Sequence, residues 1–189
     1  MAGTIYPFVQ TILKTRIAKN DCVLEIGCGS MQYRPLVSGT YEGLDLPTSP
    51  YLDEPPHYCC SAEEIPCEDG RFNLVFGVAT FLIINDIDRA FTECRRVLCP
   101  GGRLVIFDYQ KHICKRLRHV DPIHRHVWNF DDLKQRLENA GFEPDHICDI
   151  TDEADLRGSF RRALSWVLPW LRQAPDWLIV DATVAKPSI

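Results

Sequence analysis

The sequence predicts an α/β fold, an open and mostly parallel sheet with helices on both faces. Two observations predict this fold. Short apolar runs of strand length alternate with segments whose apolar residues recur at helical spacing, which favours strand–helix–strand units. The apolar run at 22–26 also leads directly into the turn Gly27-Cys28-Gly29. In open parallel sheets, ligands bind beyond the carboxyl ends of the strands, so this turn is a candidate site.

The expected elements follow one another along the chain. An amphipathic helix over 6–19 comes first, and its basic residues near the end favour the helix dipole. Strands are expected at 22–26, 41–46, 57–60, 73–78, 103–108, 142–150 and 177–185. Helical segments are expected at 33–37, 86–98, 129–140 and 155–172, the last interrupted by Pro169.

Turn and capping residues set several of these boundaries. Pro100-Gly101-Gly102 should stop the helix that begins at Asp86. Asn129 or Asp131 should cap the next helix, which should end at Gly141. The strand at 103–108 is nearly all apolar, which predicts a central position in the sheet.

Length and composition favour one globular domain without a nucleic-acid partner. The chain has 189 residues, 25% of them charged, and a net charge of -5, which leaves no basic footprint for nucleic acid. We expect one domain over 1–189, with an N-terminal helix at 1–20 and a ligand-binding core at 21–150. The segment 151–189 should supply a last helix and strand, and either packs on the sheet or covers the substrate site.

Targeting and cysteine signals favour a cytoplasmic protein with reduced thiols. The N-terminus lacks a signal-peptide pattern, and no apolar run approaches membrane-spanning length. The nine cysteines are odd in number and show no Cys-x-x-Cys spacing, which argues against a zinc site or a disulfide framework. Cys22, Cys59, Cys94 and Cys148 lie in apolar runs and are expected in the core.

Acidic residues end the first two expected strands, a pattern typical of nucleoside sites. Glu25 precedes the glycine turn, and Asp45 follows about 20 residues on, where its carboxylate can accept hydrogen bonds from ribose hydroxyls. Gln32 stands where the dinucleotide fingerprint requires glycine, which disfavours a module that binds NAD or a nucleotide-sugar. An acidic loop without a nearby basic residue suits a cofactor with a cationic centre.

At this turn the chain resembles the class I S-adenosylmethionine (SAM) methyltransferases, whose fold is Rossmann-like with a seven-stranded sheet. The resemblance is to the type 11 group and covers roughly Val23 to Ile150. Further matching segments are Ser61-Ala62-Glu63-Glu64-Ile65-Pro66, Phe72-Asn73-Leu74-Val75, Arg96-Val97-Leu98-Cys99-Pro100-Gly101-Gly102 and Asn139-Ala140-Gly141-Phe142. The run 27–36 also resembles a subgroup associated with polysaccharide and lipid gene clusters.

The resemblance implies a role for each matching position. Gly27, Cys28 and Gly29 would contact the methionine part of SAM, supported by Glu25. The other implied cofactor residues are Asp45 at the ribose hydroxyls, Leu46 beside the adenine, Ser61 and Ala62 at the adenine edge, and Val78 on the methionine and methyl side.

The chain departs from the family pattern at several positions. Met31 replaces the third glycine of the loop, and Ser61 replaces a common aspartate. Leu82 and Ile83 stand where the family often has Glu-His. The departures allow two interpretations: a SAM-dependent methyltransferase with a hydrophobic acceptor pocket, or a SAM-binding protein of the same fold without transferase activity. The intact glycines and Asp45 favour the enzyme.

The acceptor and the catalytic base are not specified by the sequence. The implied partner is a small-molecule, glycan or lipid acceptor. Candidates for a base follow the fifth strand, namely Asp108, Tyr109, His112, His119, His124 and His126. No ligand spacing on a common helix indicates a metal. Trp166 and Trp170, beside Arg161 and Arg162, either pack on the sheet or form a lid that contacts a lipid or membrane surface.

Overall fold

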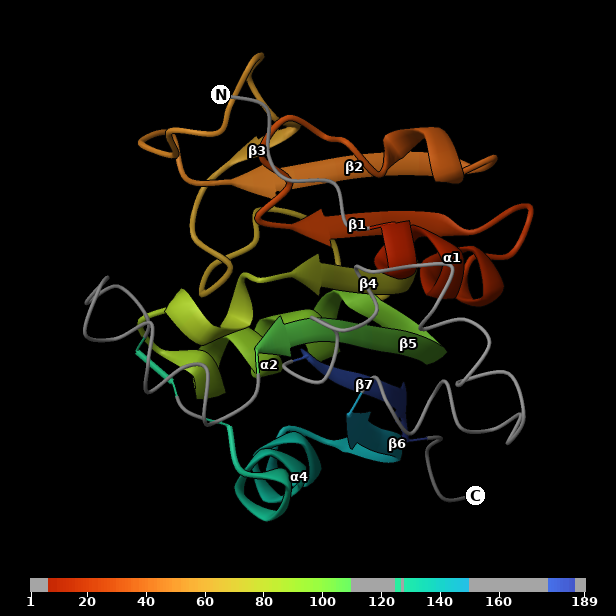
Figure 1. The fold of residues 1–189 in the computed structure, drawn as a ribbon, viewed down its shortest axis with the longest axis vertical. Helices are drawn as coiled ribbons and strands as arrows, with labels where there is room; N and C mark the ends of the chain where they lie inside the picture. The colour runs from red at the N-terminus through yellow and green to blue at the C-terminus, as the bar shows by residue number, and fades with distance from the viewer. Residues whose placement is uncertain (1–6, 110–124, 127, 150–176, 186–189) are drawn as a thin grey trace, which may run out of the picture.

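The computed structural model describes residues 7–109, 125–126, 128–149 and 177–185 (Figure 1). The predicted helix at 155–172, with Trp166 and Trp170, lies outside these residues. The described helices are α1 (Pro7–Arg16), α2 (Ile87–Val97) and α4 (Phe130–Asn139), with short 3₁₀ turns η1 (Arg34–Leu36) and η2 (Phe81–Ile83). The strands are β1 (Cys22–Ile26), β2 (Thr40–Asp45), β3 (Tyr58–Cys59), β4 (Phe72–Val78), β5 (Leu98–Tyr109), β6 (Phe142–Asp149) and β7 (Trp177–Val184).

Seven strands form one mixed sheet in the order β3-β2-β1-β4-β5-β7-β6. Strands β1 to β5 pair in parallel, whereas β7 runs antiparallel between β5 and β6. The predicted mostly parallel sheet is therefore confirmed, as is the interior position of β5. The carboxyl ends of β1, β2, β4 and β5 consequently meet at one edge of the sheet (Figure 1).

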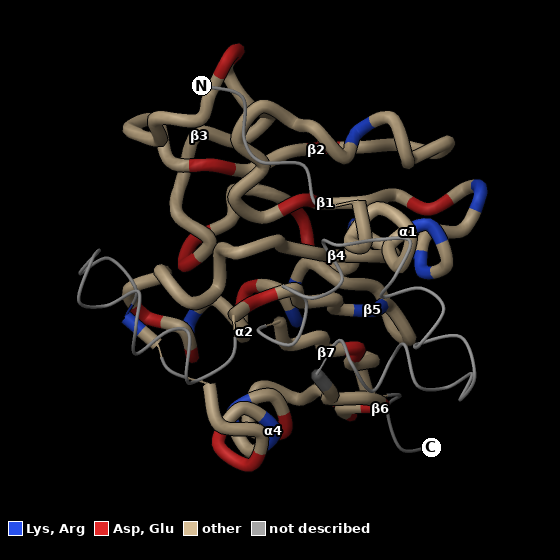
Figure 2. The backbone as a smooth tube through the Cα atoms, in the orientation of Figure 1, with Lys and Arg blue, Asp and Glu red and all other residues tan. Residues whose placement is uncertain are grey.

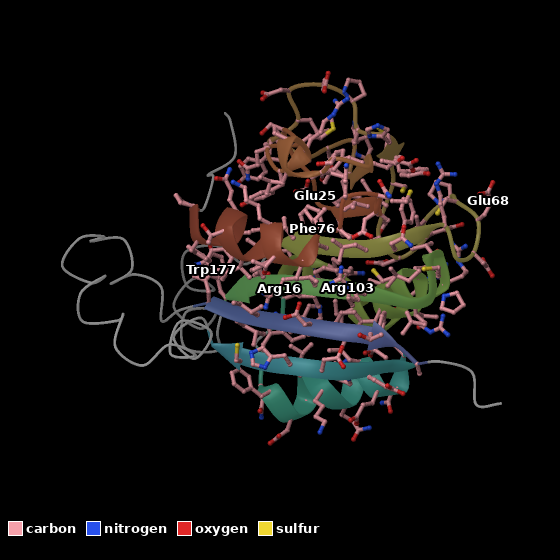
Figure 3. All side chains as sticks on the ribbon, turned by 90° about the vertical axis from the view of Figure 1, so that its right-hand side faces the viewer. Arg16, Glu25, Glu68, Phe76, Arg103 and Trp177 are labelled. Atoms are coloured by element: carbon pink, nitrogen blue, oxygen red, sulfur yellow. The ribbon has the colours of Figure 1, made fainter. Side chains whose placement is uncertain are left out.

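Helix α1 covers one face of the sheet. Its buried residues Val9 and Leu13 pack with apolar residues of β1, β4, β5 and β7, among them Phe76 and Trp177 (Figure 3). The end of α1 is tied to β7 by Arg16, whose Nε and Nη2 lie 3.3 and 2.9 Å from the two carboxylate oxygens of Asp181. Both side chains are about four-fifths buried, so this paired contact lies in the margin of the core.

Helices α2 and α4 cover the opposite face. Both have one apolar side, and these sides pack together on the sheet through residues such as Phe91 and Leu137. Asp86 caps α2 by accepting a hydrogen bond from the amide of Arg89 at 3.1 Å. Asn129 caps α4 in the same way, as predicted for that position. Figure 2 shows acidic and basic residues together on α4.

Two expectations about the core region are wrong. The helix ends at Val97, and the strand begins at Leu98, so Pro100-Gly101-Gly102 lies within β5. The pairing register shifts there between Phe72 and Leu74, because the strand must accommodate extra residues as a bulge. Cys59 is exposed, since it lies on the short edge strand β3. Cys94 and Cys148 are buried as expected, and the described cysteines are free thiols.

Candidate functional site

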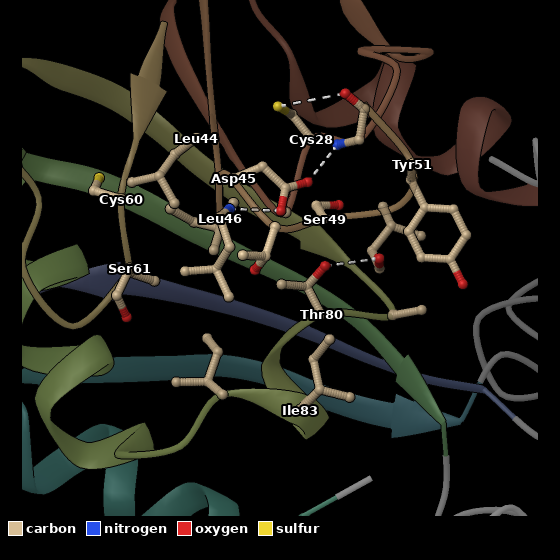
Figure 4. Close-up of a pocket in the computed structure, with 18 of the residues that line it drawn as sticks. Cys28, Leu44, Asp45, Leu46, Ser49, Tyr51, Cys60, Ser61, Thr80 and Ile83 are labelled. Atoms are coloured by element: carbon tan, nitrogen blue, oxygen red, sulfur yellow. Dashed lines mark hydrogen bonds between the residues drawn. The ribbon is translucent and has the colours of Figure 1, made fainter. Parts of the chain in front are cut away.

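A cavity of about 800 Å³ lies at the sheet edge where β1, β2, β4 and β5 end. Its wall is built from the segments that leave these strands, and Figure 4 shows part of it. Eight of the nine predicted cofactor residues line this cavity: Gly27, Cys28, Gly29, Asp45, Leu46, Ser61, Ala62 and Val78. The fold thus gathers residues from four strand ends into one pocket of the size that small-molecule sites have.

The glycine turn has a left-handed backbone at two positions. Gly27 and Gly29 have φ angles of +68° and +49°, which residues with a Cβ seldom adopt. The amides of Gly27 and Cys28 both donate to the carbonyl of Leu44, at 2.8 and 3.0 Å. Because these N–H groups are used inside the protein, a ligand would meet the Cα atoms and carbonyl groups of the turn.

Asp45 joins the end of β2 to the glycine turn. Its Oδ2 accepts a hydrogen bond from the Gly29 amide at 2.8 Å, and its Oδ1 accepts one from the Leu46 amide at 2.7 Å (Figure 4). A carboxylate has about four lone-pair positions, so each oxygen can accept another donor from the cavity. The half-buried side chain thus anchors the loop and still presents acceptor capacity to a ligand.

Glu25 does not reach the cavity wall. The side chain is 2% exposed and accepts a hydrogen bond from the Tyr41 hydroxyl. Burial raises the pKa of Glu25 to about 8, although the hydrogen bond from Tyr41 opposes the increase. Glu25 therefore stabilises the end of β1 through Tyr41 and does not contact a ligand in the cavity directly.

The segment after β4 closes the cavity on the other side. Thr80 lines the wall, and an added Cβ at Gly27 would lie only 2.3 Å from its hydroxyl oxygen. Ala79 is held at a φ of +52°, with its amide 2.7 Å from the carbonyl of Phe107. This unusual backbone conformation turns the chain from β4 toward η2 at the cavity.

The run Phe81-Leu82-Ile83-Ile84 divides between core and cavity. Phe81 and Leu82 are fully buried in the core, whereas Ile83 and Ile84 line the cavity. Of the two residues at which the chain departs from the Glu-His pattern, Leu82 therefore lies in the core and Ile83 lies at the cavity. The tight 3₁₀ turn directs the side chains of Leu82 and Ile83 to different sides of the segment.

The candidate bases take different positions. Tyr109 lines the cavity at the end of β5. Asp108 is fully buried outside the lining and accepts a hydrogen bond from Trp128 Nε1 at 3.0 Å, so it does not reach a substrate there. Burial raises the pKa of Asp108 to about 8, against the hydrogen bond from Trp128. His126 lies outside the lining, with Nε2 2.7 Å from the Ile84 carbonyl oxygen. His112, His119 and His124 lie outside the described residues.

Several lining residues were missed by the sequence analysis. The loop after β2 contributes Thr48, Ser49, Pro50 and Tyr51, and other missed positions include Cys60, Thr80, Asn85 and Arg125. Those that directly follow strand ends could have been found from the rule that ligands bind there. Arg125 follows no strand end, and nothing in the local pattern indicates it.

Two other kinds of site are absent from the part of the chain that the structure describes. In that part of the chain, no three His, Cys, Asp or Glu side chains gather as metal ligands do. None of its helices has the length and apolar character needed to span a bilayer.

The segment that contains most of the cavity residues is similar to a known protein family. Residues 24–106 match the type 11 family model described as "Methyltransferase domain". Over these residues the chain resembles the class I SAM-dependent methyltransferases. The matched residues run from β1 to β5 and include the glycine turn, Asp45 and the segment after β4. The predicted family resemblance and Rossmann-like fold are confirmed.

Two curated methyltransferases are similar to this chain. The "O-methyltransferase cnsE" of Penicillium expansum is 25% identical over 156 residues, 71% of this chain and 55% of that protein. The "Malonyl-[acyl-carrier protein] O-methyltransferase" of Geobacter sulfurreducens is 31% identical over 101 residues, 47% of this chain and 38% of that protein. The chain thus spans about half or less of the length of these relatives.

Solved structures show the same fold at lower identity. A SAM-dependent methyltransferase from Mesorhizobium loti gives a TM-score of 0.67 at 16% identity, covering 92% of this chain and 96% of that one. The [4+2]-cyclase SpnF also gives a TM-score of 0.67, at 18% identity over 95% of this chain and 80% of that one. The fold alone therefore does not specify the reaction.

Proposed function

We propose that this chain is a SAM-dependent methyltransferase that acts on a small-molecule, glycan or lipid acceptor. The observation that carries the proposal is the pairing of Asp45 with the glycine turn at adjacent strand ends. Both lie in one cavity and within the residues that match the methyltransferase family.

The residues present fit SAM better than a dinucleotide. The amides of Gly27 and Cys28 donate to Leu44 and are not directed at a phosphate, which argues against a pyrophosphate ligand. Carbonyl groups of the turn instead suit the ammonium group of a methionine moiety. Asp45 would hold the ribose hydroxyls, and Leu46 and Ala62 would flank the adenine.

The other side of the cavity would receive the acceptor. Bound SAM supplies an electrophilic methyl group, so the protein's main task is to hold the acceptor in line with it and to exclude water. Ile83, Ile84 and Tyr109 give this side an apolar wall, which supports the interpretation of a hydrophobic acceptor pocket. We propose an acceptor with an apolar part for that reason.

A base is required only for an acceptor of high pKa, such as a sugar hydroxyl. Among the described candidates Tyr109 is the one that lines the cavity, so its hydroxyl is our proposed group for proton transfer or acceptor positioning. Asp108 would act indirectly, by fixing Trp128 behind the wall.

The main alternative is a SAM-binding protein without transferase activity. The same fold occurs in a protein whose name is that of a cyclase, so the fold does not require methyl transfer. Calorimetry with SAM, NAD and a nucleotide-sugar, followed by labelled-methyl transfer to glycans, lipids and phenols, separates the two. SAM binding with transfer supports the enzyme, binding without transfer supports the alternative, and binding of NAD in place of SAM contradicts both.

Asp45→Ala provides the site-specific test. Removing the carboxylate takes away the ribose acceptor and the bond to the Gly29 amide, so SAM affinity should fall by roughly 1–3 kcal/mol, the range for charge-assisted hydrogen bonds. Glu68→Ala, at an exposed position outside the cavity lining, is the matched control. Unchanged SAM affinity in Asp45→Ala would show that the ribose assignment is wrong.

A further inference from the structure

We propose that Arg125 binds an anionic group, a carboxylate or a phosphate, on the methyl acceptor. This inference rests on the proposed function, because it assigns the acceptor's chemistry at the same cavity. Among the described residues that line the cavity, Arg125 is the one basic residue, whereas Asp45 and Glu63 are acidic. A negatively charged acceptor therefore has a single favourable partner in this part of the wall.

The backbone of Arg125 is fixed against η2. The amides of Arg125 and His126 both donate to the carbonyl of Leu82, at 2.9 and 3.0 Å. The ring of His126 donates from Nε2 to the carbonyl of Ile84 at 2.7 Å. These three hydrogen bonds hold the residue beside Ile83 and Ile84 on the cavity wall.

A second layer of contacts supports this arrangement. The His126 ring stacks on Trp128, with ring centroids 5.4 Å apart and planes inclined by 17°. Trp128 in turn donates to the buried carboxyl group of Asp108 at 3.0 Å. The end of β5 thus fixes the segment that carries Arg125, and a pre-organised guanidinium loses less entropy on binding an oxyanion.

The sheet order places Arg125 away from the ribose position. Asp45 ends β2 and Tyr109 ends β5, and β1 and β4 lie between these strands. Three strand spacings of about 4.8 Å separate the two ends by roughly 14 Å. The backbone of Arg125 is bonded to η2, which follows β4 and contacts β5, so we place Arg125 on the acceptor side of the cavity and away from the ribose.

The chemistry of this region defines the ligand class. Ile83 and Ile84 offer apolar surface, and the exposed Arg125 offers a planar fork of donors that matches a carboxylate or phosphate. The acceptor should therefore combine an apolar body with an oxyanion. A neutral acceptor of the same shape could not form a charge-assisted contact with the guanidinium.

Titration calorimetry with three matched probes tests the proposal. Octanoate, octyl phosphate and octanamide share one apolar chain and differ in the head group. Each is titrated into the chain with and without saturating S-adenosylhomocysteine. We expect at least one anionic probe to bind roughly 10- to 100-fold more tightly than octanamide, the range that a charge-assisted bidentate contact supplies. Comparison of octanoate with octyl phosphate identifies the preferred oxyanion.

Variants then assign the preference to Arg125. Arg125→Gln should abolish it, and Arg125→Lys should retain part of it, because the charge remains without the fork. Lys134→Gln removes one positive charge from exposed α4, outside the cavity lining, and should change nothing. Circular dichroism verifies that each variant is folded.

Two results would overturn the proposal: equal or undetectable binding of the charged and neutral probes, or a preference that persists in Arg125→Gln. A chain that fails to bind S-adenosylhomocysteine but keeps the Arg125-dependent preference would contradict the proposed function and leave the anion site in place.

Discussion

Gly27→Ala should destabilise the protein through two separate effects. The residue has a φ of +68°, where a Cβ costs about 1–2 kcal/mol. The added Cβ would also lie 2.3, 2.5 and 2.9 Å from Oγ1, Cγ2 and Cβ of Thr80. All three atoms are too close, so rotation of the Thr80 side chain cannot relieve the overlap, and overpacking of this kind costs about 1–3 kcal/mol. Together the two effects should lower the free energy of unfolding by about 2–5 kcal/mol.

A double-mutant cycle separates these effects by urea denaturation. Thr80→Gly removes the three atoms nearest to the new Cβ, so the overpacking part of the cost of Gly27→Ala should be smaller in that background. The cost of the left-handed backbone should persist. In the folded single variant, displacement of Thr80 into the cavity should also weaken SAM binding in calorimetry. A Gly27→Ala protein as stable as the wild type, or a cost unchanged by Thr80→Gly, would refute the reasoning.

Two further predictions concern buried charge. Because the folded chain raises the pKa of Glu25 from its ordinary 4.5 to about 8, it binds this proton more tightly than the unfolded chain does. The contribution of Glu25 to the free energy of unfolding is complete below pH 4.5 and is lost as pH rises toward 8. Because one pKa unit corresponds to about 1.4 kcal/mol, the loss should amount to a few kcal/mol. Urea denaturation from pH 5 to 8 measures how steeply the free energy of unfolding falls with pH. Glu25→Gln should make this fall less steep, whereas exposed Glu143→Gln should not change it. Equal slopes in both variants would contradict the prediction. Second, a double-mutant cycle of Arg16→Gln and Asp181→Asn should give a coupling energy of about 1–2 kcal/mol, because the paired contact is largely buried. A coupling near zero would mean that this contact does not stabilise the packing of α1 on β7.

The ligand-binding half of the fold was predictable because its signals are local. The strand at 22–26, the glycine turn and Asp45 lie within 24 residues, and each has a residue type that its backbone or chemistry requires. The carboxyl ends of parallel strands lie at the same edge of the sheet, so the residues at these ends are candidates for the ligand site. The same rule could have indicated Thr80, which follows β4 as Asp45 ends β2.

The acceptor side was less predictable because distant contacts decide it. Asp108 stands at a strand end like Asp45, but Trp128, twenty residues on, covers it. Leu82 and Ile83 are adjacent apolar residues, and only the geometry of η2 assigns one to the core and the other to the cavity. A backbone hydrogen bond to Leu82 holds Arg125 at the cavity wall, and the hydrophobic pattern of the sequence does not predict such a contact.

The antiparallel strand β7 has a consequence for biosynthesis. A ribosome completes β5 and β6 before it makes β7, yet β7 is the partner of both. Until residues 177–184 leave the exit tunnel, β5 and β6 each present an unpaired edge of N–H and C=O groups. The nascent chain therefore exposes two aggregation-prone strand edges for the time needed to translate the residues that follow β6. A stop after β6 would leave those edges open permanently, and such a fragment should aggregate even though it retains the glycine turn and Asp45.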